Sequence, residues 1–342
     1  MKQAVTIDYH EAQRIAKRAL SAAGVPDAYV AIQVDLLIEA ELCGRASHGL
    51  LRLPRIAQRI HNGVCDCHTT GTAHWKSEAF LEVNGRMGLG PVVACSALDL
   101  LSQRVKQTGI ALAAIHNNNH LGMLGWYAER VAKEGRALIA LSTSEALVHP
   151  WGGRKAMLGT NPIAVGVPAQ PHPFVIDMAT SLVSMGQIHD YAHRGEPMPD
   201  TWALDANGEP TNDAVAARDG AIAPFGGPKG YALGLAFEVL VTSLSGAAIG
   251  TDIKGTLDAT ERCNKGDVFI MIDAGVSGAA QRLSSYLEAI RNCPPSRPGT
   301  PVLVPGDRAR MSRQRRLEEG IELSVPVWRD IVALAAGTSS VN

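Results

Sequence analysis

The sequence predicts a mixed α/β fold, of the α+β kind, that is not a Rossmann fold. Three observations support this. The first two are that residues 76–293 alternate strand-like apolar runs with helical patterns and that both ends of the chain have helical periodicity. The third is that Gly85-Arg-Met-Gly-Leu-Gly90 has the wrong spacing for a dinucleotide fingerprint, and no other window matches it. We therefore expect a helical terminal domain of residues 1–75 plus 294–342, and an α/β domain at residues 76–293.

Composition limits the classes of protein to be considered. The chain has 342 residues, of which 46% are hydrophobic and 19% charged, enough for substantial cores. The formal net charge of -1 gives no global bias toward nucleic acid or an anionic membrane. We see neither a signal peptide at the start nor an apolar window long enough to span a bilayer. The six cysteines lack zinc-ribbon spacing, so we expect reduced thiols and a cytoplasmic location, with no partner among nucleic acids or membranes.

The first 60 or so residues contain three helical patterns. Asp8 is placed to cap the first helix, and Gly24 followed by a proline ends it. A second pattern runs over about residues 28–43. Pro54 fits the first turn of a third helix, residues 55–62.

The sequence pattern at the centre of the chain predicts the strands of the sheet. The pattern at the end of the chain predicts helices that pack on the amino-terminal helices. Buried strands are short apolar runs, and helices are longer periodic ones. A loop-like stretch rich in Gly, Pro, Asn and Asp covers residues 195–227, either a long ordered loop or a boundary. The expected strands are 79–83, 110–115, 136–142, 174–177 and 267–273, and the expected helices are 91–107, one after Trp126, 178–192, 229–244, 281–291, 308–319 and 327–335.

A polar cluster directly follows the apolar strand 110–115. It comprises His116, three asparagines and His120, and Gly122 then leads into a helix. Ligands of α/β proteins sit at the carboxyl ends of strands, and histidine exchanges protons near neutral pH, so we interpret this as a catalytic site. An Asn-rich surface turn is the alternative. A metal-dependent hydrolase using His116 and His120 is a rival interpretation, weakened because no carboxylate lies between them.

Two further groups of residues are suited to binding anions. Phe225-Gly-Gly-Pro-Lys-Gly230 opens a helix, where free N–H groups and Lys229 favour a phosphate or pyrophosphate, although the segment is not a P-loop. Its alternative is a glycine-rich cap with a solvated lysine. Ser47-His48-Gly49 lies close to Arg52, a residue type that binds carboxylates bidentately. A non-enzymatic anion binder using Arg52 and Lys229 therefore remains a second rival.

Together these motifs resemble the malate/L-lactate dehydrogenase family of the non-Rossmann type. Met185-Gly-Gln-Ile188, Trp202-Ala-Leu-Asp205 and Lys265-Gly-Asp267 resemble its (2R)-3-sulfolactate dehydrogenase branch. The six family motifs occur in order from about residue 10 to about residue 325. They are Ser47-His-Gly-Leu-Leu-Arg-Leu-Pro54, Asn119-His-Leu-Gly122, Leu158-Gly-Thr-Asn-Pro-Ile-Ala164, Asp177-Met-Ala-Thr-Ser181, Pro224-Phe-Gly-Gly-Pro-Lys-Gly230 and Val304-Pro-Gly-Asp307.

The resemblance implies NAD or NADP bound on a mixed sheet, a homodimer, and oxidation of a 2-hydroxy acid or reduction of the 2-oxo acid. Matching motif by motif implies His120 as the proton-transfer residue, His48 and Arg52 as further catalytic residues, and Ser47, His48 and Arg52 as substrate contacts. No metal is implied. The implied cofactor contacts are Ser142, Thr160, Asn161, Asp177, Met178, Ala179, Lys229, Gly306, Asp307 and Arg308.

Departures from the family pattern bear on the substrate. Gln187, His116 and Leu121 replace residues that are commonly Lys, Arg and Phe in the family. We expect a dianionic substrate, sulfolactate or malate. A second anionic group that is buried needs a positively charged or hydrogen-bonding partner of its own. His48 is the expected partner, ahead of Arg55. The alternatives are an NADPH-dependent reductase of a cyclic imino acid and a ureidoglycolate-type dehydrogenase.

Overall fold

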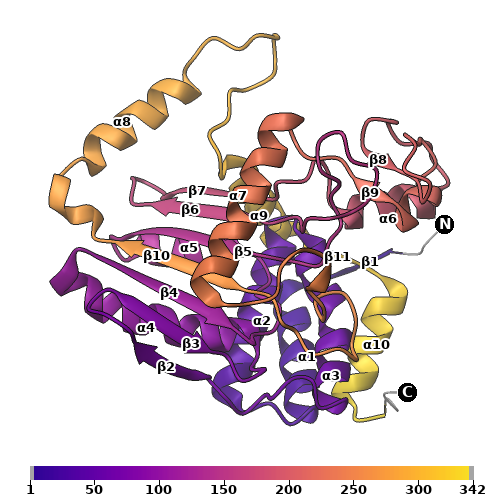
Figure 1. The fold of residues 1–342 in the computed structure, drawn as a ribbon, viewed down its shortest axis with the longest axis horizontal. Helices are drawn as coiled ribbons and strands as arrows, with labels where there is room; N and C mark the ends of the chain where they lie inside the picture. Colours follow the sequence, from indigo (N-terminus) through magenta and orange to yellow (C-terminus); the bar gives the residue numbers. More distant parts are fainter. Residues whose placement is uncertain (1–3, 339–342) are drawn as a thin grey trace.

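The structure is a computed structural model that describes residues 4–338, apart from the side chains of residues 276 and 277. Its centre is a seven-stranded sheet in the order β2-β3-β4-β10-β5-β6-β7 (Figure 1). Only β3 and β4 are parallel neighbours, so the sheet is mixed and the predicted fold class is confirmed. The strands are β2 (Thr72–Trp75), β3 (Phe80–Asn84), β4 (Ile110–His116), β5 (Ala137–Ser142), β6 (Ile163–Val167), β7 (Phe174–Met178) and β10 (Asp267–Ile272).

The two faces of the sheet contact different helices. Successive side chains of a strand point to opposite faces, so Ala113 of β4 joins the main core and Ala114 joins a smaller cluster. Helices α4 (Gly90–Thr108) and α5 (Leu124–Lys133) contribute to the main core. A single helix, α7 (Pro228–Ser245), crosses the other face (Figure 1). That face is consequently covered only in part.

Both ends of the chain build the helical region. Strand β1 (Ala4–Ile7) pairs antiparallel with β11 (Ile321–Ser324), which ties the two ends together. The Asp8 side chain caps the first helix by accepting from the amides of His10 and Glu11, as its sequence context predicts. The domain boundaries stay a prediction, and residues 1–3 and 339–342 lie outside the described part. The helices are α1 (Tyr9–Ala22), α2 (Asp27–Leu42), α3 (Leu53–His61), α9 (Asp307–Glu319) and α10 (Val325–Ala335).

One prediction for the middle of the chain is wrong in detail, and a second is made more specific by the structure. The helix expected at residues 178–192 begins seven residues later as α6 (Met185–Arg194), because the Ser184 hydroxyl caps it by accepting from the Gln187 amide. The stretch 195–227 is not a plain loop. It packs with α6 around a core of its own that contains Ile188, Met198 and Ile222. Its elements are β8 (Ala203–Leu204), the 3-10 helix η3 (Ala216–Asp219) and β9 (Ala221–Ile222).

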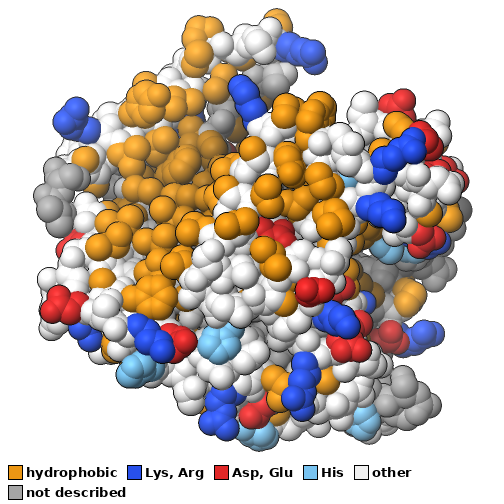
Figure 2. Space-filling view, viewed as in Figure 1, with side chains coloured by type: hydrophobic (Ala, Val, Ile, Leu, Met, Phe, Trp, Pro, Cys, Tyr) orange, Lys and Arg blue, Asp and Glu red, His pale blue; other side chains and the backbone are white. Residues whose placement is uncertain are grey.

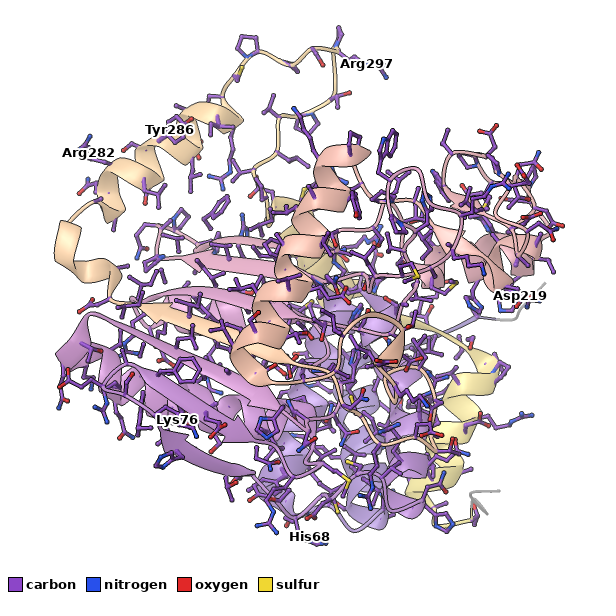
Figure 3. All side chains as sticks on the ribbon, in the orientation of Figure 1. His68, Lys76, Asp219, Arg282, Tyr286 and Arg297 are labelled. Carbon is purple, nitrogen blue, oxygen red and sulfur yellow. The ribbon has the colours of Figure 1, made fainter. Side chains whose placement is uncertain are left out.

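Helix α8 (Ala280–Arg291) stands away from the sheet on an arm of the chain (Figure 1). Arg282, Tyr286 and, beyond the helix, Arg297 lie at the periphery (Figure 3). Leu287 on its inner side packs with Ala169 and Val304. Short 3-10 helices complete the fold at η4 (Gly250–Asp252) and η5 (Ala274–Ser277). Within residues 4–338, no helix combines the length and apolar character needed to cross a bilayer.

Candidate active site

The site is built at one edge of the sheet, where β4 and β5 end on either side of the start of β10. Asp267 of β10 lies in register with Ile115 of β4 and with Ser142 of β5. Its buried carboxylate accepts from the Ser142 hydroxyl at 2.6 Å and from the Asn118 amide at 3.3 Å. It also pairs with Lys265, which is 1% exposed. The Asp267 carboxylate thus connects the end of β5 with the segment that follows β4.

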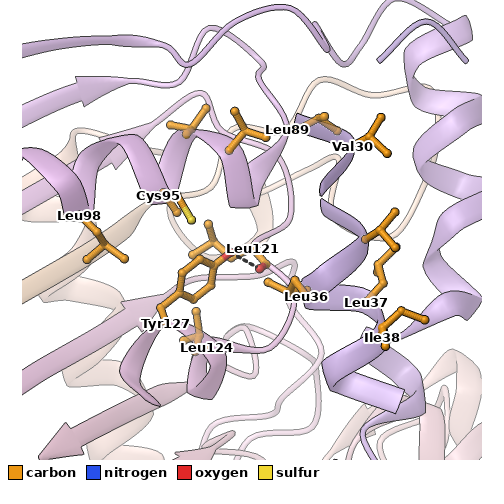
Figure 4. Packing of buried hydrophobic residues seen from close by; sticks show 14 of the residues in the cluster. Val30, Leu36, Leu37, Ile38, Leu89, Cys95, Leu98, Leu121, Leu124 and Tyr127 are labelled. Atoms are coloured by element: carbon orange, nitrogen blue, oxygen red, sulfur yellow. Dashed lines mark hydrogen bonds between the residues drawn. The ribbon is translucent and has the colours of Figure 1, made fainter. Parts of the chain in front are cut away.

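The loop after β4 carries His120 and is held firmly against α2. Gly122 has a φ of +73°, and a Cβ there would come within 2.2 Å of Leu36, so only glycine fits. The buried Tyr127 hydroxyl donates to the carbonyl oxygen of Leu121 at 2.6 Å (Figure 4). The loop therefore places the His120 ring in the lining of a pocket.

The hydrogen bonding of His120 determines which ring nitrogen carries the proton. Its Nδ1 accepts from the Gly122 amide at 2.9 Å, and an amide N–H can only donate. The neutral ring therefore carries its proton on Nε2. Burial, followed by the positive charge of Arg52, holds the pKa of His120 well below its usual range. The site presents a neutral imidazole that can donate from Nε2.

Two 3-10 turns, η1 (Ala46–His48) and η2 (Leu50–Arg52), bring His48 and Arg52 into the same pocket, with Ser47 next to His48. The Ser47 hydroxyl and His48 Nδ1 lie 3.0 Å apart, and Arg52 Nε donates to the Ser47 carbonyl oxygen at 2.8 Å. The ring centroids of His48 and His120 are 5.5 Å apart. The structure thus brings His120 next to Ser47, His48 and Arg52, which lie about 70 residues earlier in the sequence.

The pKa of His48 bears on the role of second-anion partner expected from the sequence, which stays a prediction. Burial, and then the charges of Arg52 and Arg45, lower its pKa to about 3. His48 is therefore neutral at physiological pH. A neutral ring can donate a hydrogen bond but supplies no positive charge for a second anion.

Glu41 anchors the turns that carry these residues, and sequence patterns do not identify it. This fully buried residue near the end of α2 accepts from the Leu50 amide at 2.7 Å. A Cβ on Gly49 would approach the Glu41 carboxylate within 2.2 Å, so the turn packs directly on this side chain. The available signal is an acidic residue inside the apolar pattern of a helix. The position of Ser47, His48 and Arg52 depends on this contact.

Glu41 gives a testable pH dependence of stability. Burial, partly offset by the Leu50 amide, raises its pKa from 4.5 to about 7. Its stabilising effect is therefore complete below about pH 4.5 and is lost as pH rises through about 7, a change of about 3 kcal/mol. We expect the unfolding free energy of the wild type to fall by about that much relative to Glu41→Gln between pH 5 and pH 8 in denaturant titrations. An unchanged difference between the two proteins would contradict it.

His116 lies apart from this pocket, and this weakens the hydrolase interpretation. Its side chain lines a separate surface cavity with His74, Glu82 and Asn84, whereas His120 lines the pocket with Arg52. Among the described residues, no group of three or more His, Cys, Asp or Glu side chains is placed to hold a metal ion. The two histidines therefore do not form the shared metal site that the hydrolase would need.

The residues expected to contact the cofactor line the neighbouring part of the sheet edge. Ser142 is buried against Asp267, as described above. Thr160 and Asn161 precede β6, and the carbonyl oxygen of Thr160 accepts from the amide of Thr180 at 2.8 Å. The Oδ1 atom of Asn161 is buried without a hydrogen-bond partner among the described residues. That atom is one observation in favour of a bound polar ligand.

The segment 177–179 and the start of α7 face the same region. Asp177 Oδ2 accepts from the Gly125 amide at 2.8 Å, and Met178 and Ala179 follow it, half-buried. The Ser181 hydroxyl is another buried group without a partner in the described chain. Lys229 is exposed at the first turn of α7, whose start has no side-chain cap. These free donors and acceptors fit the phosphates and ribose groups of a dinucleotide.

The predicted contacts at residues 306–308 lie farther along β7. A Cβ on Gly306 would lie 3.2 Å from the carbonyl oxygen of Val175. The Asp307 carboxylate is already paired with Arg291 and Arg310, so its charge is used within the protein. Arg308 is exposed. The turn is close to the proposed cofactor region, but only Arg308 offers it an unused charge.

Glu238 is a second buried carboxylate that sequence patterns miss. It projects from the middle of α7, and its Oε2 atom accepts from the Asn161 side-chain amide at 2.6 Å and from the Gly159 amide at 3.2 Å. Oε1 accepts from the Gly250 amide at 2.6 Å. Glu238 therefore fixes the loop before β6 against the helix that carries Lys229.

Comparison with known proteins agrees with this geometry. The malate/L-lactate dehydrogenase family profile matches residues 7–332. An L-sulfolactate dehydrogenase of Methanothermobacter thermautotrophicus is 35% identical over 96% of each chain. A delta(1)-pyrroline-2-carboxylate reductase of Pseudomonas fluorescens is 30% identical over 98% of this chain and all of that one. The crystal structure of a dehydrogenase from Sinorhizobium meliloti superposes with a TM-score of 0.95 at 45% identity, covering 98% of this chain and 99% of the other.

Proposed function

Because this chain belongs to the malate/L-lactate dehydrogenase family, we propose that it transfers a hydride between NAD or NADP and a small 2-hydroxy acid/2-oxo acid pair. It is a dehydrogenase that acts on hydroxy acids, and we propose a dianionic substrate, sulfolactate or malate. The observation that carries the proposal is a pocket that places two histidines beside cationic arginines.

The charges in the pocket support a dianion. Arg52, Arg55 and Arg59 all line it, and none of the three forms an ion pair with a carboxylate of residues 4–338. Positive charges placed together without a counterion repel one another and lose solvation. A substrate with two anionic groups relieves this repulsion more fully than lactate, which carries one.

The roles of the side chains follow from their hydrogen bonds. Arg52 uses Nε and Nη1 on backbone carbonyl oxygens, which leaves Nη2 to hold the carboxylate next to the reacting carbon. A bound nicotinamide supplies or accepts the hydride. The Nε2–H of neutral His120 donates to the carbonyl oxygen of a 2-oxo acid and holds the proton that the alkoxide takes up. This protonation suits the reductive direction.

Lys229 provides a separate test of the cofactor region. It adds a positive charge to the uncapped start of α7, where a dinucleotide phosphate would bind. We expect Lys229→Ala to raise the dissociation constant of the cofactor roughly ten- to a hundredfold, the loss of one charge-assisted contact. Fluorescence titration with NADH and NADPH measures this, and catalysis at saturation should remain largely intact. An unchanged dissociation constant for both cofactors would show that Lys229 does not contact the cofactor phosphate.

A substrate panel tests the function itself. Purified wild type is assayed by nicotinamide absorbance with NADH and NADPH against pyruvate, oxaloacetate, 3-sulfopyruvate and 1-pyrroline-2-carboxylate, and in the oxidative direction with ureidoglycolate. We expect the highest kcat/KM with oxaloacetate or 3-sulfopyruvate. Preference for the cyclic imine or for ureidoglycolate would support the corresponding alternative. Binding without turnover of any compound would support the anion binder instead.

We also propose that the chain is a cytoplasmic homodimer. Leu233, Leu235, Val239 and Leu240 of α7 are 37–47% exposed, and they continue the apolar surface over the sheet face that α7 covers only in part (Figure 2). Patches of this kind mark interaction sites. A second copy is the partner that the family resemblance implies. All six cysteines are free thiols, as in a reducing compartment. Sedimentation velocity of the pure protein tests the dimer, and a monomer would contradict it.

A further inference from the structure

Arg55 is the least committed of the arginines around the pocket. Arg52 precedes α3, Arg55 is in its first turn, and Arg59 is one turn later, so the spacing puts all three on the face that lines the pocket. His48 and His120 line the same pocket. The three arginines therefore line one side of the space in which the reaction is proposed to occur.

The other two guanidinium groups are partly or wholly used within the protein. Arg59 is buried and donates to Asn119 Oδ1 at 2.9 Å and to the carbonyl oxygens of Asp258 and Glu261 at 2.8 and 3.0 Å. Arg52 donates to two carbonyl oxygens and keeps one Nη group free. Arg55 is exposed and has no hydrogen bond or ion pair from its side chain to any residue in the described chain.

Arg55 is also close enough to influence the reacting groups. Burial, and then the charge of Arg55, lower the pKa of Arg52 to about 10. Arg55 is among the charges that lower the pKa of His120 as well, after burial, Arg52 and other neighbours. The positive charge of Arg55 thus acts on groups in the pocket, and no carboxylate of residues 4–338 pairs with it. His48 carries no charge there, for the reason given above.

We propose that Arg55 binds a second anionic group of the substrate, a carboxylate or sulfonate on C3, while Arg52 holds the carboxylate on the other side of the reacting carbon. Arg55 is then the specificity-determining residue that separates dianionic acids from lactate and pyruvate. This inference rests on the proposed dehydrogenase function and assigns to Arg55 the role that sequence patterns favour for His48.

The test compares Arg55→Met with wild type for reduction of pyruvate, oxaloacetate and 3-sulfopyruvate. We expect kcat/KM for the two dianions to fall roughly ten- to a hundredfold, mainly through KM, while that for pyruvate changes by less than about twofold. Arg55→Lys should retain much of the preference, since a lysine keeps the charge. Arg329→Met, at an exposed position on α10, is the matched control and should behave as wild type.

The outcomes distinguish a failure of the proposed dehydrogenase function from a failure of the role proposed for Arg55. If wild type reduces none of the three acids with NADH or NADPH, the dehydrogenase function itself is wrong. If wild type prefers pyruvate, or if Arg55→Met lowers all three acids by one common factor, the function stands and the role of Arg55 is overturned. Because Arg55 is exposed and has no bond to lose, its variants should unfold at the wild-type temperature, and this shows that an altered preference is not a folding defect.

Discussion

Replacing His120 by alanine is expected to lower kcat by about 10²- to 10⁴-fold, the usual loss on removing a group that transfers a proton in the transition state. The cofactor should still bind, since its proposed contacts lie along β6, β7 and α7 and not on His120. His120 donates no hydrogen bond to the protein from Nε2 among the described contacts, so this nitrogen is available to the substrate oxygen. Steady-state kinetics together with cofactor titration measure the two effects separately.

His116→Ala is the matched control for this prediction. His116 is a histidine of the same segment, four residues earlier, but it lines a different cavity. Its removal should change kcat only slightly. Losses of equal size in the two variants, together with metal in the purified protein, would revive the hydrolase interpretation and contradict the assignment of His120.

The elements that the sequence locates well are those with local signals. Helix α1 has an N-cap at Asp8, and α3 has a proline in its first turn, so both are found within one or two residues. The pairing of the sheet is not local. Strand β10 inserts between β4 and β5 from far along the chain, and β1 pairs with β11 at the opposite end. No window of sequence contains both partners of such a pair, and β1 and β11 are missed. Strands β2 and β6 pair with their chain neighbours β3 and β7 and are missed as well, as are the two-residue strands β8 and β9.

The candidate site also combines features that local sequence signals reveal with features that arise only on folding. The motifs around Ser47 and His120 are readable because their residue types carry chemistry, and the structure gathers them in one pocket. The charge of His48 is not readable, because its pKa depends mainly on burial, which arises only on folding, and then on the nearby Arg52 and Arg45. Glu41 and Glu238 support the site through backbone amides, and these contacts exist only in the folded chain.

The buried pair of Lys265 and Asp267 carries the second large prediction. Asp267→Ala should lower the free energy of unfolding by about 3–5 kcal/mol, because Lys265 is left as a buried charge without a partner. The Ser142 hydroxyl and the Asn118 amide lose their acceptor in the same variant. Denaturant unfolding followed by circular dichroism measures the loss. A cost below about 1 kcal/mol would mean that the pair does not hold this edge of the sheet together.

A second variant separates charge from shape at this position. In Asp267→Asn with Lys265→Met both charges are removed, so the penalty of an unpaired charge disappears and most of the lost stability should return. Catalysis should not return to the same degree. Asp267 is the acceptor that aligns Asn118, two residues before His120, with Ser142 of the proposed cofactor region. A double variant that is stable and also fully active would show that the pair serves folding alone, whereas a stable but slow enzyme would show that its carboxylate positions the two halves of the site.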